Sequence, residues 1–156
     1  MKDNTHFNIG KVTALRSVRQ KIDELNGTLK SLSCPVIDDF ALLPRLYEAY
    51  LNVFARRGSP DAALRVYNRK KFLLIVLYLY CPAALSGERM KAGLRSKLSA
   101  LFGLTASTPI SDNCTDLLFT YQNFRDFRRD VDIIYKEIAD VILSESNGKE
   151  IPCKNG

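Results

Sequence analysis

A run of ten residues without a charge, residues 72–81, limits the folds open to this chain more than any other feature. A segment that is apolar on every side must be buried, either as a strand or as a helix. Two features favour a helix that starts at residues 59–61: Ser-Pro-Asp there is typical of a helix start, and no glycine or proline follows before Pro82. The neighbouring segments also have helical patterns. We therefore predict a helix that ends near Tyr80 and forms the centre of the core.

Helical patterns recur on both sides of this run. Apolar residues repeat at three- and four-residue steps over about residues 15–32, 39–57, 88–102 and 110–143. Gly58 and Gly103 follow two of these segments, in the position where a left-handed residue commonly ends a helix. The sequence therefore predicts an all-α, single-domain helical bundle of about five helices, with a buried central helix and a long C-terminal helix.

Length and composition agree with a single domain. A chain of 156 residues can bury about two-thirds of its unfolded surface. We expect a flexible N-terminus over residues 1–8, a helical domain over residues 9–143, and a flexible C-terminal tail over residues 144–156. The apolar run is shorter than the roughly 20 residues that a membrane span needs, and residues 1–11 lack the apolar core of a signal peptide. We expect a cytoplasmic protein without a membrane partner.

The sequence has no pattern of a metal site or of an enzyme. Cys34, Cys81, Cys114 and Cys153 stand far apart, whereas zinc sites need close cysteine pairs. His6 is the only histidine, and neither a glycine-rich phosphate loop nor a serine-nucleophile motif is present. We therefore predict a non-enzymatic protein without a metal, a cofactor or a small-molecule substrate.

A heptad pattern marks the first predicted helix. Six apolar residues follow one another at spacings of 3, 4, 3, 4 and 3, namely Leu15, Val18, Ile22, Leu25, Leu29 and Leu32. This spacing places them on one narrow stripe of the helix, as a coiled coil requires. We call this stripe the seam. Two interpretations follow: the seam packs against the chain's own domain, or it is the oligomer interface of a homodimer.

Charge is unevenly distributed along the chain. The net charge is +6. Residues 65–97 hold eight basic side chains against Glu88 alone, whereas residues 112–150 hold nine acidic side chains against five basic ones. A basic middle beside an acidic end indicates either a polyanionic partner for the middle or counter-charges that neighbouring helices supply to it.

Residues 89–121 have the layout of a helix-turn-helix: an amphipathic helix, a turn at Gly103, and a second helix that begins with hydroxyl and amide residues. In such motifs the start of the second helix enters the major groove of DNA. Residues 94–117 resemble the helix-turn-helix segments of prokaryotic and phage regulators. The resemblance implies contacts to base edges from Ser107, Thr108, Ser111, Asn113 and Thr115. It implies contacts to phosphates from Arg89, Lys91, Arg95 and Lys97.

A wider similarity bears on the biological setting. Residues 69–138 are similar to small uncharacterised proteins of gut anaerobes and their mobile elements. We predict a small helix-turn-helix protein that binds double-stranded DNA, a regulator linked to a phage or mobile element. Against this, Asp112 and Asp116 place carboxylates where phosphates would lie. The alternative is a non-enzymatic interaction or structural module that acts through helical self-association.

Overall fold

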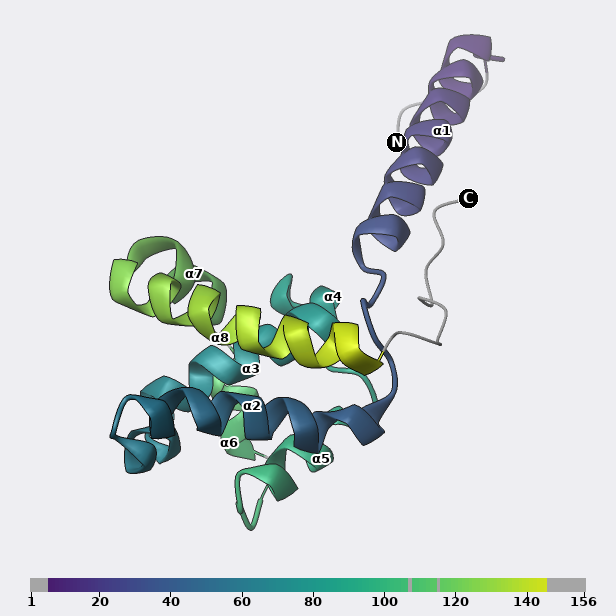
Figure 1. Cartoon of the computed structure of the whole chain (residues 1–156). Coiled ribbons are helices and arrows are strands. Elements are labelled where there is room, and N and C mark those ends of the chain that lie inside the picture. Colours follow the sequence, from purple (N-terminus) through teal and green to yellow (C-terminus); the bar gives the residue numbers. More distant parts are fainter. Residues whose placement is uncertain (1–5, 107, 115, 146–156) are drawn as a thin grey trace. The chain divides into compact units, whose positions relative to one another are not determined.

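The computed structural model describes residues 6–106, 108–114 and 116–145, with the exception of the side chains of residues 108 and 112. Within these ranges the chain is all-helical, which confirms the predicted fold class (Figure 1). No helix there combines the length and the apolar character that crossing a bilayer requires.

The chain forms two compact units that divide between Ser33 and Cys34, where the sequence predicts one domain over residues 9–143. Most of the predicted flexible termini, residues 1–5 and 146–156, lies outside the described residues. Ser144 and Glu145, the first residues of the predicted tail, belong to the last helix.

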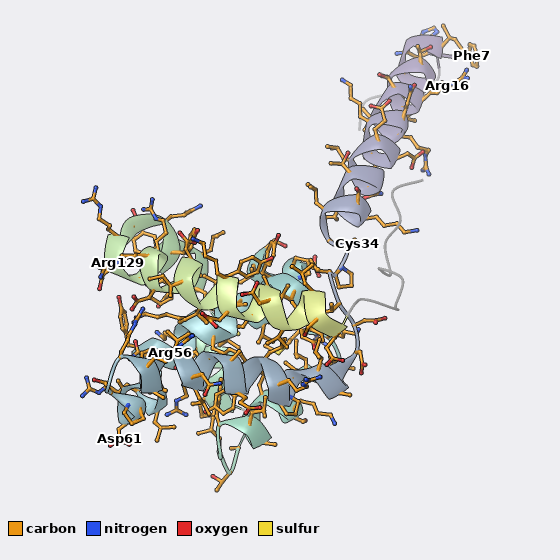
Figure 2. The ribbon with its side chains drawn as sticks, viewed as in Figure 1. Phe7, Arg16, Cys34, Arg56, Asp61 and Arg129 are labelled. Carbon is orange, nitrogen blue, oxygen red and sulfur yellow. The ribbon has the colours of Figure 1, made fainter. Side chains whose placement is uncertain are left out.

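Helix α1 (Ile9–Leu32) forms the first unit. The Asn8 side chain caps its start by accepting a hydrogen bond from the backbone N–H of Lys11 at 3.2 Å. At its end, the backbone N–H of Ser33 donates to the carbonyl of Leu29 at 2.9 Å. No residue of α1 is buried within this unit, and Figure 2 shows its side chains projecting on all sides.

The second unit contains seven further α-helices in the described residues, where the sequence predicts about five in the whole chain. They are α2 (Leu43–Arg56), α3 (Val66–Tyr80), α4 (Pro82–Leu85), α5 (Leu94–Leu101), α6 (Thr108–Asn113), α7 (Leu117–Asn123) and α8 (Arg125–Glu145). Two short 3₁₀ helices, η1 (Phe40–Leu42) and η2 (Pro60–Leu64), precede α2 and α3.

Helix α3 contains most of the charge-free run and lies at the centre of the second unit. Every residue from Lys71 to Leu77 is buried. The ring of Phe72 contacts two aromatic rings of α2, with centroid distances of 5.3 Å to Tyr47 and 5.2 Å to Tyr50. Helix α8 packs on both α2 and α3. The charge-free run is therefore covered from several sides.

The central helix begins later than the sequence predicts. Residues 60–64 form a 3₁₀ turn, and Arg65 is extended with φ −68° and ψ 140°, so the α-helix starts at Val66. Side chains take the carbonyls that a continuous helix would use. The Tyr50 hydroxyl donates to the carbonyl of Ala63 at 2.6 Å, and the Asn68 amide donates to the carbonyl of Ala62 at 2.8 Å. These hydrogen bonds stabilise the break.

The long C-terminal helix that the sequence predicts over residues 110–143 is divided into α6, α7 and α8. Between α7 and α8 the backbone of Phe124 is extended, with φ −112° and ψ 108°. The guanidinium of Arg128 caps the freed end of α7, because it donates to the carbonyls of Tyr121 at 3.1 Å and Gln122 at 2.9 Å. This cap satisfies carbonyls that a helix end would otherwise leave unpaired.

Candidate nucleic-acid interface

Helix α5, the turn after it and α6 form the segment that the sequence predicts as a helix-turn-helix. Helix α5 begins at Leu94, not near residue 88 as predicted, because Gly93 has a left-handed backbone with φ 84°. Leu94 and Leu98 of α5 and Ile110 of α6 are fully buried, so the two helices pack through aliphatic side chains. The buried Ser99 hydroxyl donates to the carbonyl of Ala106 at 2.9 Å. The first helix and the turn are thus held together.

The turn has the hydrogen bonds of a Schellman motif. Gly103 is left-handed with φ 67°, and its N–H donates to the carbonyl of Ala100 at 3.1 Å. The N–H of Leu104 donates to the carbonyl of Ser99 at 2.9 Å. These two bonds satisfy the last carbonyls of α5 and reverse the chain towards α6.

Replacing Gly103 by alanine is expected to lower the free energy of unfolding by about 1 kcal/mol, because a β-carbon disfavours the left-handed backbone. A β-carbon added at Gly103 meets no atom within 4 Å, so backbone strain is the main cause of the expected loss of stability. The matched variant Gly103→Asn should lose less, since asparagine tolerates this conformation. Urea unfolding of both variants checks the difference, and equal losses would contradict the strained turn.

The predicted groove-facing residues are only partly described. Ser107 and Thr115 lie outside the described residues, and the side chain of Thr108 is not described. Ser111 and Asn113 are half-buried on α6, a helix of six residues that is about 9 Å long. Helix α6 is therefore much shorter than the helix that the sequence predicts from residue 110.

The predicted phosphate contacts are brought together in part. Arg89, Arg95 and Ser111 line one hollow of about 500 Å³. Within it the Arg95 guanidinium donates to the Ser111 hydroxyl at 2.8 Å. Glu88 lines the same hollow and reduces its positive charge.

Two other cations lie nearby in the sequence. The ammonium of Lys91 lies 5.2 Å from the centroid of the Phe40 ring, a cation–π contact. Lys97 is exposed on α5. Within the described part of the chain, Arg89, Lys91, Arg95 and Lys97 form no ion pair. We call these four residues the cationic group.

Carboxylates in the acidic C-terminal part of the chain form ion pairs, but with cations that do not belong to the cationic group. Arg56 on α2 pairs with Glu137 at 2.8 Å, and Arg45 pairs with Glu145. Asp130 of α8 accepts from both Arg57 at 3.2 Å and Lys71 at 2.7 Å. Within the described residues, the carboxylates of α8 therefore pair with cations of α2, of its C-terminal neighbour Arg57 and of α3, and none of them pairs with the cationic group.

Sequence reasoning missed one cation beside the turn. The guanidinium carbon of Arg69, on α3, lies 5.6 Å from the centroid of the Phe102 ring, next to Gly103. The basic cluster at residues 69–71 was the only available signal, and it is ambiguous because its third member, Lys71, is buried. Only the tertiary contacts separate a surface cation from a core one.

The hollow contains one thiol, that of Cys114. Burial raises the pKa of this thiol to about 11, although the charge of Arg95 opposes the shift. The thiol is therefore protonated at neutral pH, whereas a reactive cysteine needs the thiolate. In the described residues, no three histidine, cysteine, aspartate or glutamate side chains are grouped to hold a metal ion.

A second, largely apolar cavity of about 310 Å³ lies among α3, α4, α7 and α8. Among its polar lining residues, the Tyr121 hydroxyl donates to a carboxylate oxygen of Asp132 at 2.9 Å. This cavity contains none of the predicted site residues.

The residues of the seam all lie on α1, as predicted. The most covered of them, Ile22, is 50% exposed, and the most open, Leu32, is 75% exposed. The seam is thus an uncovered aliphatic stripe within its own unit.

Comparison with known proteins finds no matching family model, no similar curated protein and no similar solved structure.

Proposed function

We propose that this chain binds double-stranded DNA through α5, the turn at Gly103 and α6. The observation that carries the proposal is the selective pairing of charge. Carboxylates of α8 neutralise cations of α2 and α3, whereas the cationic group has no carboxylate partner in the described residues. Unpaired cations gathered on one segment attract a polyanion and release its counterions on binding.

The two sides of the turn would have different roles in the complex. Arg89 and Arg95 line one hollow and would contact phosphates, which position a protein on the duplex without reading its sequence. Ser111 and Asn113 of α6 can contact base edges, and asparagine can pair with adenine through two hydrogen bonds. Because α6 is short, few side chains can read bases. Most of the affinity should then come from phosphate contacts and depend strongly on salt.

The resemblance of residues 69–138 to small uncharacterised proteins of gut anaerobes and their mobile elements supports a link to such an element or to a phage. This part of the proposal concerns the setting of the protein, not its chemistry. It adds no residue to the interface.

The experiment measures affinity for a duplex by fluorescence anisotropy over a range of salt concentrations. Four phosphate contacts predict that affinity falls about 100-fold between roughly 50 and 200 mM salt. The variant Lys91→Glu with Arg95→Glu should bind at least tenfold more weakly and show a smaller salt slope. Glu88→Gln should bind a few-fold more tightly, because this carboxylate lines the hollow.

A matched control reverses two charges elsewhere. Arg129 and Lys136 are exposed on α8 and form no ion pair in the described residues. In the view of Figure 1, α8 lies above α2, whereas α5 and α6 lie below it. Arg129→Glu with Lys136→Glu makes the same change in net charge and should leave most of the affinity intact. Equal losses in the two double variants would exclude α5 and α6 as the interface.

A further inference from the structure

The seam of α1 lacks a partner within its own unit. Helix α1 is about 36 Å long, and all of its described side chains are exposed there. A single helix gains little stability from its own backbone in water, because helices in proteins gain most of their stability by packing an apolar face. A second surface with the same period is therefore needed to stabilise α1.

The order of residues in the seam suits a partner with the same sequence. In the heptad, the a positions hold Leu15, Ile22 and Leu29, and the d positions hold Val18, Leu25 and Leu32. The central heptad, with Ile22 at a and Leu25 at d, has the combination of two-stranded coiled coils, whereas the first heptad has leucine at a and β-branched Val18 at d. No polar residue interrupts the seam to select a different partner or register.

We propose that the seam of α1 pairs with the seam of a second copy of this chain in a two-stranded coiled coil. Each copy then supplies both the knobs and the holes of the interface, as a symmetric homodimer requires. The proposal does not depend on DNA binding, since it uses residues of the other unit.

The flanks of the seam permit this pairing. Arg19 occupies an e position and Lys21 a g position, and no acidic residue stands at either kind of position between residues 12 and 32. In a parallel pair, Lys21 faces Asn26 of the second copy and Arg19 faces Ala14 of the second copy. Contacts between like charges would oppose association, and none occur at these flanking positions of the interface.

Gly27 offers a second way to test whether α1 pairs, one that leaves the seam unchanged. It occupies an f position, on the side opposite the seam, and a β-carbon added there meets no atom within 4 Å. Alanine at this position favours the helix without touching the interface. If folding of α1 is coupled to pairing, Gly27→Ala must strengthen the dimer.

The experiment is sedimentation velocity of the full chain from low micromolar to about 100 µM. The wild type should be a dimer at the upper end, and Gly27→Ala should lower its dissociation constant about tenfold. Ile22→Glu with Leu25→Glu should be monomeric over the whole range. The matched control, Ser17→Glu with Ser31→Glu, adds the same charge at c positions and should dimerise like the wild type.

Circular dichroism and the DNA-binding assay accompany these measurements. A monomeric seam variant that keeps its duplex affinity per chain and the helices of the second unit shows that pairing alone was lost. A wild type that stays monomeric at about 100 µM overturns the proposal. So does a seam variant that dimerises like the wild type, because another surface would then hold the copies together.

Discussion

Replacement of Asp130 by alanine is expected to lower the free energy of unfolding by about 3–5 kcal/mol, the typical loss when one partner of a buried ion pair is removed. The large effect comes from the buried lysine that loses its partner when Asp130 is removed. The side chain of Lys71 is only 4% exposed, so its amino group would remain buried without its carboxylate partner. A surface ion pair of the same residue types would contribute about 1 kcal/mol or less.

The geometry around Lys71 explains why the pair is so sensitive. Its ammonium donates to Asp130 at 2.7 Å and to the side-chain oxygen of Asn68 at 2.8 Å. It also lies 4.8 Å from the centroid of the Tyr67 ring and 5.8 Å from that of Phe127. The fully buried ring of Phe127 keeps water from one side of the ammonium. Asp130 therefore joins α8 to α3 through one buried contact.

Urea unfolding of three variants checks this expectation. Asp140→Ala, an exposed aspartate on the same helix, is the control and should change stability by less than about 0.5 kcal/mol. Lys71→Met with Asp130→Leu should lose less than Asp130→Ala alone, because no uncompensated charge remains buried. If the double variant loses as much as or more than the single one, the penalty of an unpaired lysine is not the cause.

The same pair gives stability a defined pH dependence. Partial burial raises the pKa of Asp130, but the hydrogen bonds and charges of Lys71 and Arg57 outweigh this, so its pKa is lowered in the folded state. Its contribution is fully present above the unfolded pKa of about 4 and is lost as the pH falls through the lower folded pKa. The stability difference between wild type and Asp130→Asn should shrink as the pH falls below about 4. A difference that stays constant between neutral and acidic pH would contradict this assignment.

Replacement of Phe72 by alanine is expected to lower the free energy of unfolding by about 3–5 kcal/mol, since it leaves a cavity at the centre of the core. The side chain is fully buried. Its ring contacts Tyr47 and Tyr50 of α2 and lies 6.1 Å from the ring of Phe102 at the end of α5. The substitution therefore removes contacts to two other helices at once.

The matched control for this variant is Val66→Ala on the same helix. Val66 is 51% exposed, so its truncation should change stability by less than about 0.5 kcal/mol. Thermal and urea unfolding followed by circular dichroism measure both. Similar losses in the two variants would mean that α3 is not buried along its second half. A small loss in Phe72→Ala would point to a core that closes around the missing ring.

The charge-free run shows how far sequence alone can predict this fold. Residues 72–81 contain no charged side chain, and a segment of that kind is stable only when its neighbours cover it. The helix and its burial could therefore be predicted without knowing which elements cover it. The start of the helix could not, because it depends on Tyr50, whose hydroxyl binds the carbonyl of Ala63 from 13 residues away.

The division of the predicted C-terminal helix could not be predicted from sequence either, because it also depends on contacts that form only in the folded chain. Residues 110–143 keep an apolar stripe of helical period through the breaks, so periodicity alone predicts one helix. The break at Phe124 is stabilised by Arg128, which caps two carbonyls of α7. A cap formed by the side chain of a following helix has no signature in the local pattern.

The amino-acid sequence by itself determined the all-helical character, the seam on α1 and the glycine turn, because these depend on local spacing and on backbone preferences. Only the tertiary structure decided where the helices break and which cations of the described residues are paired. Lys71 stands directly after Arg69 and Lys70 in the chain, yet it is buried against Asp130, 59 residues away, whereas the cationic group keeps no such partner in the described residues. The physical reason is that an ion pair depends on distance in space, and the fold, not the order of residues, sets that distance.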